Sequence, residues 1–159
     1  MSLPPELSEH ALVRALQGMH PHAVAAATVF RQQLIIEVPA SLLRTVCECL
    51  RSHPDFPFEF LADLTAVDRY PLEPRFEVVY QLLSLPANQR LCLKARIPRD
   101  NPRIDSVSSL WSAANWLERE VFDLFGIHFN GHPKLRRLLL PEDWEGHPLR
   151  KDYPVEGYR

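Results

Sequence analysis

From Trp116 to Tyr153 the chain reads WLEREVFDLFGIHFNGHPKLRRLLLPEDWEGHPLRKDY, a stretch that concentrates charges, aromatic residues and three histidines. Up to Phe125 the spacing of its apolar residues is typical of a helix. From Gly126 onward glycine and proline recur too often for a regular element to run long, so that part has to be extended and held by contacts made elsewhere. The sequence therefore predicts an α+β domain over residues 1–125 and an extended C-terminal arm over residues 126–159.

The helical half has one apolar stripe when its residues are placed at about 100° each. The stripe consists of Val107, Leu110, Trp111, Ala114, Leu117, Val121, Leu124 and Phe125. Glu118 falls inside this stripe, where a carboxylate is costly unless it is paired, so we expect it to be at least half buried and bonded to backbone donors or to Arg136 or Arg137. Trp116, Arg119, Glu120 and Asp123 fall on the opposite side. Trp116 is then either an exposed rim aromatic or an anchor for another chain.

The rest of the chain predicts alternating helices and strands. The expected elements are a helix over Leu7–Leu16 with a Ser8 cap and Gly18 at its end, a hairpin of Ala23–Phe30 and Leu34–Val38, a helix from Pro39 to His53, strands over Phe76–Ser84 and Leu91–Ile97, and a longest helix over Ser106–Phe125. Residues Phe58–Val67 fit either a strand or a helical turn, and a strand is favoured. The last two strands alternate apolar and polar residues and should be adjacent and antiparallel. This order predicts an α+β fold with an antiparallel or mixed sheet packed against helices.

Composition limits the function classes. The chain has 159 residues, a net charge of −2 and a pI near 6.4, which gives no overall attraction to nucleic acid. Acidic residues stand between the basic residues Arg136, Arg137, Arg150 and Lys151 and reduce their attraction for phosphate, so a nucleic-acid-binding function is not favoured. No stretch approaches the roughly 20 apolar residues of a membrane helix, and the start MSLPPELSEH does not resemble a signal peptide. We expect membrane association only through partner subunits.

Motifs for an active site are weak. The five glycines form neither a dinucleotide fingerprint nor a P-loop, and Cys47, Cys49 and Cys92 have no metal-binding spacing, so they are read as core residues. His128, His132 and His147 with nearby carboxylates are possible metal ligands, but glycine and proline break the helix that would place the first two on one face. A small metal-dependent hydrolase therefore stays as an alternative from a different class.

Two blocks of residues resemble a known family. Glu118-Arg119-Glu120 with Asp123-Leu124-Phe125-Gly126-Ile127, followed by Gly131-His132-Pro133 and the run from Arg137 to Pro154, closely resembles the signature of the C subunit (30 kDa subunit) of respiratory NADH:quinone oxidoreductase, complex I. Asp63–Asp68 and Arg75–Tyr80 are similar to further segments of that family. The resemblance covers most of the chain from about Phe58 onward.

The resemblance implies a non-catalytic structural subunit of the hydrophilic arm of this proton-translocating complex. It would brace the quinone-reducing module next to the D (49 kDa) and B subunits, on the cytoplasmic side of the cell membrane. This chain would bind no cofactor, and the complex would carry FMN and iron–sulfur clusters on other subunits. The expected interface or signature residues are Trp116, Glu118, Arg119, Glu120, Asp123, His132, Arg136, Arg137, Trp144, His147, Arg150, Lys151, Asp152 and Tyr153. A related subunit of a membrane-bound hydrogenase or formate hydrogenlyase is the alternative within the same class.

Overall fold

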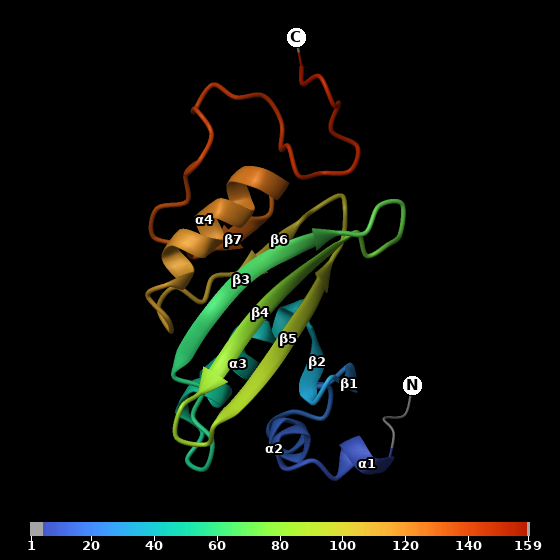
Figure 1. The fold of residues 1–159 in the computed structure, drawn as a ribbon, viewed down its shortest axis with the longest axis vertical. Coiled ribbons are helices and arrows are strands. Elements are labelled where there is room, and N and C mark those ends of the chain that lie inside the picture. The colour runs from blue at the N-terminus through green and yellow to red at the C-terminus, as the bar shows by residue number, and fades with distance from the viewer. Residues whose placement is uncertain (1–4, 159) are drawn as a thin grey trace.

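The computed structural model describes residues 5–158, so part of the predicted start and the last residue of the predicted arm lie outside it. Its elements are α1 (Pro5–Ser8), α2 (Ala11–Met19), β1 (Ala26–Phe30), β2 (Gln33–Pro39), the 3-10 turn η1 (Ala40–Leu42), α3 (Leu43–Ser52), β3 (Phe60–Asp68), β4 (Phe76–Ser84), β5 (Gln89–Ile97), β6 (Arg103–Asp105), α4 (Ala114–Phe125) and β7 (His128–Asn130). Figure 1 shows a long twisted sheet with α4 beside one end and the arm looping over that helix.

A mixed five-stranded sheet in the order β1-β2-β5-β4-β3 forms the centre of the fold. The pair β2–β5 is parallel, whereas the other neighbours are antiparallel. The predicted α+β class and the antiparallel pairing of β4 with β5 are therefore confirmed. The predicted hairpin is confirmed as well, with Arg31 and Gln32 both at positive φ in its turn. Its first strand begins at Ala26 rather than Ala23, because the backbone of Ala23 closes a turn on His20.

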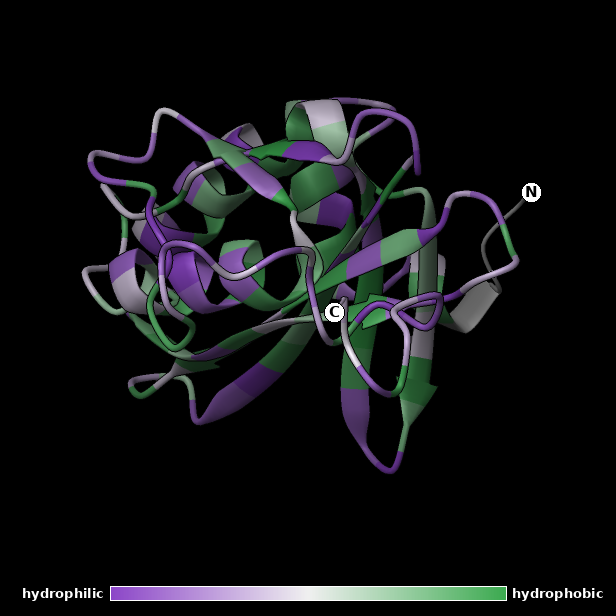
Figure 2. Cartoon of the chain, turned by 90° about the horizontal axis from the view of Figure 1, so that it is seen from above, coloured by the Kyte–Doolittle hydropathy of each residue, from purple (hydrophilic) through white to green (hydrophobic). Residues whose placement is uncertain are grey.

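The hydrophobic core lies on one face of the sheet. Along β4, Phe76, Val78, Tyr80 and Leu82 are buried together with side chains from α3 and α4. The opposite face carries charges, where Glu77 pairs with both Arg69 and Lys94 at 3.0 Å. This alternation is the period of two expected of a strand with one core face, and it shows as alternating colours along the strands in Figure 2.

The predicted helix over Ser106–Phe125 is wrong in its first part, since α4 begins only at Ala114. Residues 107–113 form turns, in which Leu110 and Trp111 both donate to the carbonyl of Val107. The physical reason is the Glu118 carboxylate, which accepts from the Ser106 hydroxyl at 2.6 Å and from the Val107 N–H at 2.7 Å. These bonds hold the segment against the side of α4, so it cannot extend the helix axis.

Several further elements differ from the sequence prediction. The expected helix Leu7–Leu16 is divided in two, because α1 ends at Ser8 and His10 caps α2 by accepting from the Leu12 N–H. Gly18 lies inside α2, which ends at Met19. The strands β6 and β7 were not predicted; they pair in parallel and bury Ile104 opposite Phe129. Residues 131–158 contain no helix or strand, and the division of the chain after Phe125 stays a prediction.

Candidate interaction site of the C-terminal arm

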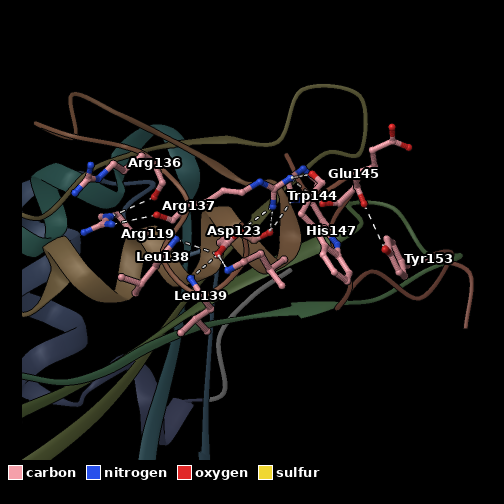
Figure 3. A network of polar contacts seen from close by, with 12 residues as sticks. Arg119, Asp123, Arg136, Arg137, Leu138, Leu139, Trp144, Glu145, His147 and Tyr153 are labelled. Atoms are coloured by element: carbon pink, nitrogen blue, oxygen red, sulfur yellow. Dashed lines mark hydrogen bonds and ion pairs between the residues drawn. The ribbon is translucent and has the colours of Figure 1, made fainter. Parts of the chain in front are cut away.

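Asp123, on the last turns of α4, is the main attachment point of the arm. One carboxylate oxygen accepts three successive backbone N–H groups, from Leu138 at 3.0 Å, Leu139 at 2.8 Å and Leu140 at 2.9 Å. The other oxygen accepts from the Arg137 guanidinium at 2.7 Å. Figure 3 shows these groups converging on one side chain. Asp123 is fully buried, so a single carboxylate fixes four consecutive arm residues.

Ionisation of Asp123 is favoured by its partners. Burial raises the pKa of this carboxyl, but the three N–H donors and Arg137 act in the opposite direction and hold the pKa below its usual value. Arg137 also donates to the carbonyls of Trp144 at 2.8 Å and Gly146 at 3.0 Å. One buried ion pair therefore ties two separate turns of the arm to the domain.

The C-terminal end of α4 gives the arm a second set of contacts. Its last carbonyls have no partner within a helix, and here the arm supplies donors. His147 Nδ1 lies 2.8 Å from the Asp123 carbonyl, the Leu149 N–H donates to Leu124 at 3.1 Å, and the Arg150 guanidinium donates to Phe125 at 2.6 Å. Because a carbonyl only accepts, His147 carries its hydrogen on Nδ1. Burial, its largest influence, lowers the pKa of His147 and favours this neutral form.

Gly126 makes this close approach possible. It ends α4 in the left-handed conformation, with φ of 71°, and its N–H donates to Phe122. A Cβ at this position would lie 2.5 Å from both the Arg150 guanidinium and the His147 ring. Any other residue would have to strain its backbone and also displace the two side chains that cap the helix.

A second ion-pair cluster attaches the far end of the arm to the sheet. Arg75 is buried and makes paired bonds to Asp68, at 2.9 and 2.8 Å, and to Asp152, at 2.9 and 2.6 Å. The Lys151 N–H donates to Asp68 at 2.8 Å. Burial raises the pKa of Asp68, but bonds from Arg75 and Lys151 outweigh it and bring the pKa to about 2. The two acids therefore hold a single guanidinium between β3 and the arm.

The helical wheel places Arg119 and Asp123 on the side of α4 opposite the apolar stripe. In the structure the arm covers this side, so both residues are buried. Arg119 is only 7% exposed and donates to the carbonyls of Arg136 and Arg137 at 3.2 and 3.1 Å. Its guanidinium stacks on the Trp116 ring, 4.9 Å from the centroid. Trp116 itself is 60% exposed, and Glu120 is also exposed.

Glu118 is fully buried, and its predicted burial with backbone donors is confirmed. The proposed partners Arg136 and Arg137 are wrong, because Arg137 pairs with Asp123 and Arg136 is exposed on the arm. Burial is the main cause that raises the pKa of Glu118 to about 7, against the bonds from Ser106 and Val107. At neutral pH this carboxyl is therefore partly protonated.

The remaining predicted residues are all on or under the arm. His132 bonds the Asn115 carbonyl at 3.0 Å, Tyr153 donates to the Glu145 carbonyl at 3.3 Å, and Trp144 is 41% exposed. The functional residues that the site prediction omitted are Arg75 and Asp68. Both residues lie in the segments that resemble the family, Asp63–Asp68 and Arg75–Tyr80. From the sequence alone, the opposite charges of Asp68 and Arg75 were not connected with each other or with Asp152.

In the part of the chain that the structure describes, the site consists of buried ion pairs, contacts to the end of α4 and exposed apolar side chains. Within residues 5–158, no three His, Cys, Asp or Glu side chains gather as a metal-binding group. Within the same range no helix is long and apolar enough to cross a membrane. Cys47, Cys49 and Cys92 are free thiols, and burial raises the pKa of each.

The protein is a small α+β domain that holds an extended C-terminal arm against its own helix α4. Residues 36–159 match the family described as the 30 kDa subunit of respiratory-chain NADH dehydrogenase. The chain belongs to this family.

Relatives and solved structures agree with this membership. The chain is 45% identical to the NADH-quinone oxidoreductase C subunit of Roseiflexus sp. (strain RS-1), over 94% of this chain and 86% of the relative. It is 50% identical to the corresponding C subunit of Geobacter metallireducens, over 80% and 78%. A trypsin-resistant fragment of Nqo5 has a TM-score of 0.62 and 33% sequence identity, over 78% of this chain and 98% of the fragment. A chain of an archaeal membrane-bound sulfane sulfur reductase has a TM-score of 0.76 and 32% identity, over 91% of this chain and 84% of that chain.

Proposed function

We propose that this chain is a non-catalytic structural subunit of the hydrophilic arm of a proton-translocating NADH:quinone oxidoreductase. It braces the quinone-reducing module, contacts the D and B subunits through the arm, and binds no FMN or iron–sulfur cluster itself. It lies on the cytoplasmic side of the membrane as a peripheral part of the complex. The isolated chain has no activity with NADH and quinone.

One observation supports the assembly role above others. The arm is attached to its own domain mainly through polar groups, with Leu135 packed against the core, while several of its other apolar side chains are exposed. Leu139 is 62% exposed, Leu149 52% and Val155 fully exposed. Exposed apolar side chains on a fixed backbone are typical of a surface that another chain covers, because little ordering entropy remains to be lost on docking.

The alternatives have less support. Relatives named as quinone oxidoreductase subunits reach 45–50% identity, whereas the match to the sulfane sulfur reductase complex has 32%. The identities to the named C subunits support the quinone enzyme. An independent metal hydrolase requires stoichiometric metal, so elemental analysis of the purified chain separates it from the structural subunit.

Deletion of the residues after Pro141 tests the proposal in the native membrane complex. The deletion removes Asp152 from Arg75 and the carbonyl partners of Arg137, but leaves the bonds from Leu138–Leu140 to Asp123 in place. We expect the domain to stay folded by circular dichroism while recovery of the companion D and B subunits falls, and quinone reduction falls with it. A full-length chain with Leu85→Ala, on the distant β4–β5 turn, is the control. Normal assembly with reduced turnover would contradict the structural role.

A further inference from the structure

A hollow of about 460 Å³ lies within the arm itself. Its main lining consists of Trp144, Tyr153 and Tyr158 together with Asp143, Glu145 and Glu156. Among the described residues, no lysine or arginine lines it. The hollow therefore combines three aromatic rings with three carboxyl groups and has no positive charge of its own.

Two of the three rings of this hollow are held in place by packing. Tyr153 and Tyr158 meet edge to face, with ring centroids 5.3 Å apart and planes at 87°. Both rings pack onto Gly146, where a Cβ would lie 2.8 Å from each. The Gly146 carbonyl in turn accepts from Arg137, which pairs with buried Asp123. The shape of the hollow is thus tied to the main attachment point of the arm.

The carboxyl groups of the hollow differ from the other acids near the arm. Asp68, Asp123 and Asp152 each pair with an arginine. By contrast, the side chains of Asp143, Glu145 and Glu156 make no ion pair within residues 5–158. Unpaired negative charge beside aromatic faces is complementary to one chemical class, a cation that stacks on a ring and pairs with a carboxylate.

We propose that the hollow receives a cationic side chain of a neighbouring subunit, with arginine favoured over lysine. A guanidinium is planar, so it stacks on Trp144 or Tyr158 and still presents two N–H groups to a carboxylate. This inference rests on the proposed assembly role of the arm and adds the chemistry of the partner surface. The exposed rings supply contact area, and the carboxylates select a positive partner.

A triple neutralisation tests this proposal in the membrane complex. The variant Asp143→Asn, Glu145→Gln, Glu156→Gln removes three negative charges from the hollow. The matched control, Asp55→Asn, Glu59→Gln, Glu142→Gln, removes the same charges from exposed positions outside it. Tagged chains are purified at low and raised salt, and companion subunits are quantified. We expect the hollow variant to retain its companions about tenfold less well than the control, with a weaker salt dependence.

Equal recovery with the two triple variants overturns the proposal. If the chain lacking residues after Pro141 then loses its companions, the assembly role stands and only the cation site fails. If that truncated chain also keeps them, both fail together. A second measurement leaves the lining of the hollow unchanged: a photo-crosslinking residue, p-benzoylphenylalanine, replaces Val155, which is fully exposed and does not line the hollow. Crosslinks to a neighbouring protein of the complex at a peptide with arginine or lysine at the contact support the site, whereas crosslinks confined to this chain overturn it.

Discussion

The sheet domain and the arm are ordered by different kinds of interaction. The five-stranded sheet buries a continuous apolar cluster that includes Leu93, Tyr80 and Phe76. Residues 131–158 have no regular element, and their positions depend on a few buried charges, chiefly Asp123 and Arg75. The arm is thus ordered without regular secondary structure, because each buried charge fixes several of its backbone groups at once.

The largest expected effect is that of Asp123→Ala, which removes the acceptor of four bonds and leaves Arg137 without its carboxylate. Breaking a buried ion pair in this way costs about 3 to 5 kcal/mol. The cost should appear locally, as a loss of at least about 100-fold in hydrogen-exchange protection of the Leu138–Leu140 amides. The exposed neighbour Glu120→Ala is the control and should leave this protection unchanged. Unaltered protection in the Asp123 variant would show that apolar contacts hold the arm.

The converse change is Leu93→Ala, in the middle of β5 and fully buried. Truncating such a core leucine costs about 2 to 5 kcal/mol in the free energy of unfolding, because it leaves a cavity. We expect the free energy of global unfolding, measured by urea denaturation, to fall. The free energy of local opening at the Leu138–Leu140 amides, measured by hydrogen exchange, should stay unchanged. Thr65→Ala, exposed on β3, serves as control and should change stability by less than about 0.5 kcal/mol. If Leu93→Ala instead lowered the hydrogen-exchange protection of the arm selectively, the sheet domain and the arm would not be ordered by separate interactions.

The same division explains what could be predicted from the sequence. The pairing of β4 with β5 was predictable, since both strands alternate along their length and a short turn joins them. The burial of Glu118 was predictable from its position on the apolar stripe. Both features depend on residues that are close in sequence, where periodicity carries the information.

Features that need distant partners were not predictable. The strands β6 and β7 have three residues each and pair across residues 103–130, which no local pattern indicates. The burial of Arg119 and Asp123 depends on the arm covering the polar side of α4, and a helical wheel describes only the helix itself. The start of α4 at Ala114 depends on a side-chain bond from Glu118 back to residues 106 and 107.

Glu118 gives the domain a pH dependence that the arm does not share. Its pKa is raised from 4.5 to about 7 in the folded chain, so the folded state holds this proton more tightly than the unfolded state. The resulting stabilisation is complete below about pH 4.5 and is lost as the pH rises through about 7, by at most about 3 kcal/mol. We expect Glu118→Gln to gain about 1 to 3 kcal/mol relative to the unmodified chain between pH 5 and pH 8.

Urea denaturation at several pH values measures this difference. The exposed Glu120→Gln on the same helix is the matched control and should run parallel to the unmodified chain. Parallel curves for the Glu118 variant as well would mean that the carboxyl is ionised in the folded state at pH 5, so that its bonds from Ser106 and Val107 outweigh its burial.

The smallest expected effect on stability is that of Trp116→Ala, and it separates the two interpretations of this side chain. Trp116 is 60% exposed, so its loss removes mainly the stacking with Arg119, about 0.5 to 1 kcal/mol, and thermal unfolding should change little. If Trp116 anchors a partner chain, recovery of companion subunits should nevertheless fall, because an exposed aromatic beside an ordered arginine is typical of interface hot spots. Leu85→Ala removes an equally exposed apolar side chain, 65% exposed, far from the arm, and should affect neither property. Undiminished recovery with the Trp116 variant would make this residue an exposed rim aromatic and confine the partner surface to the arm beyond β7.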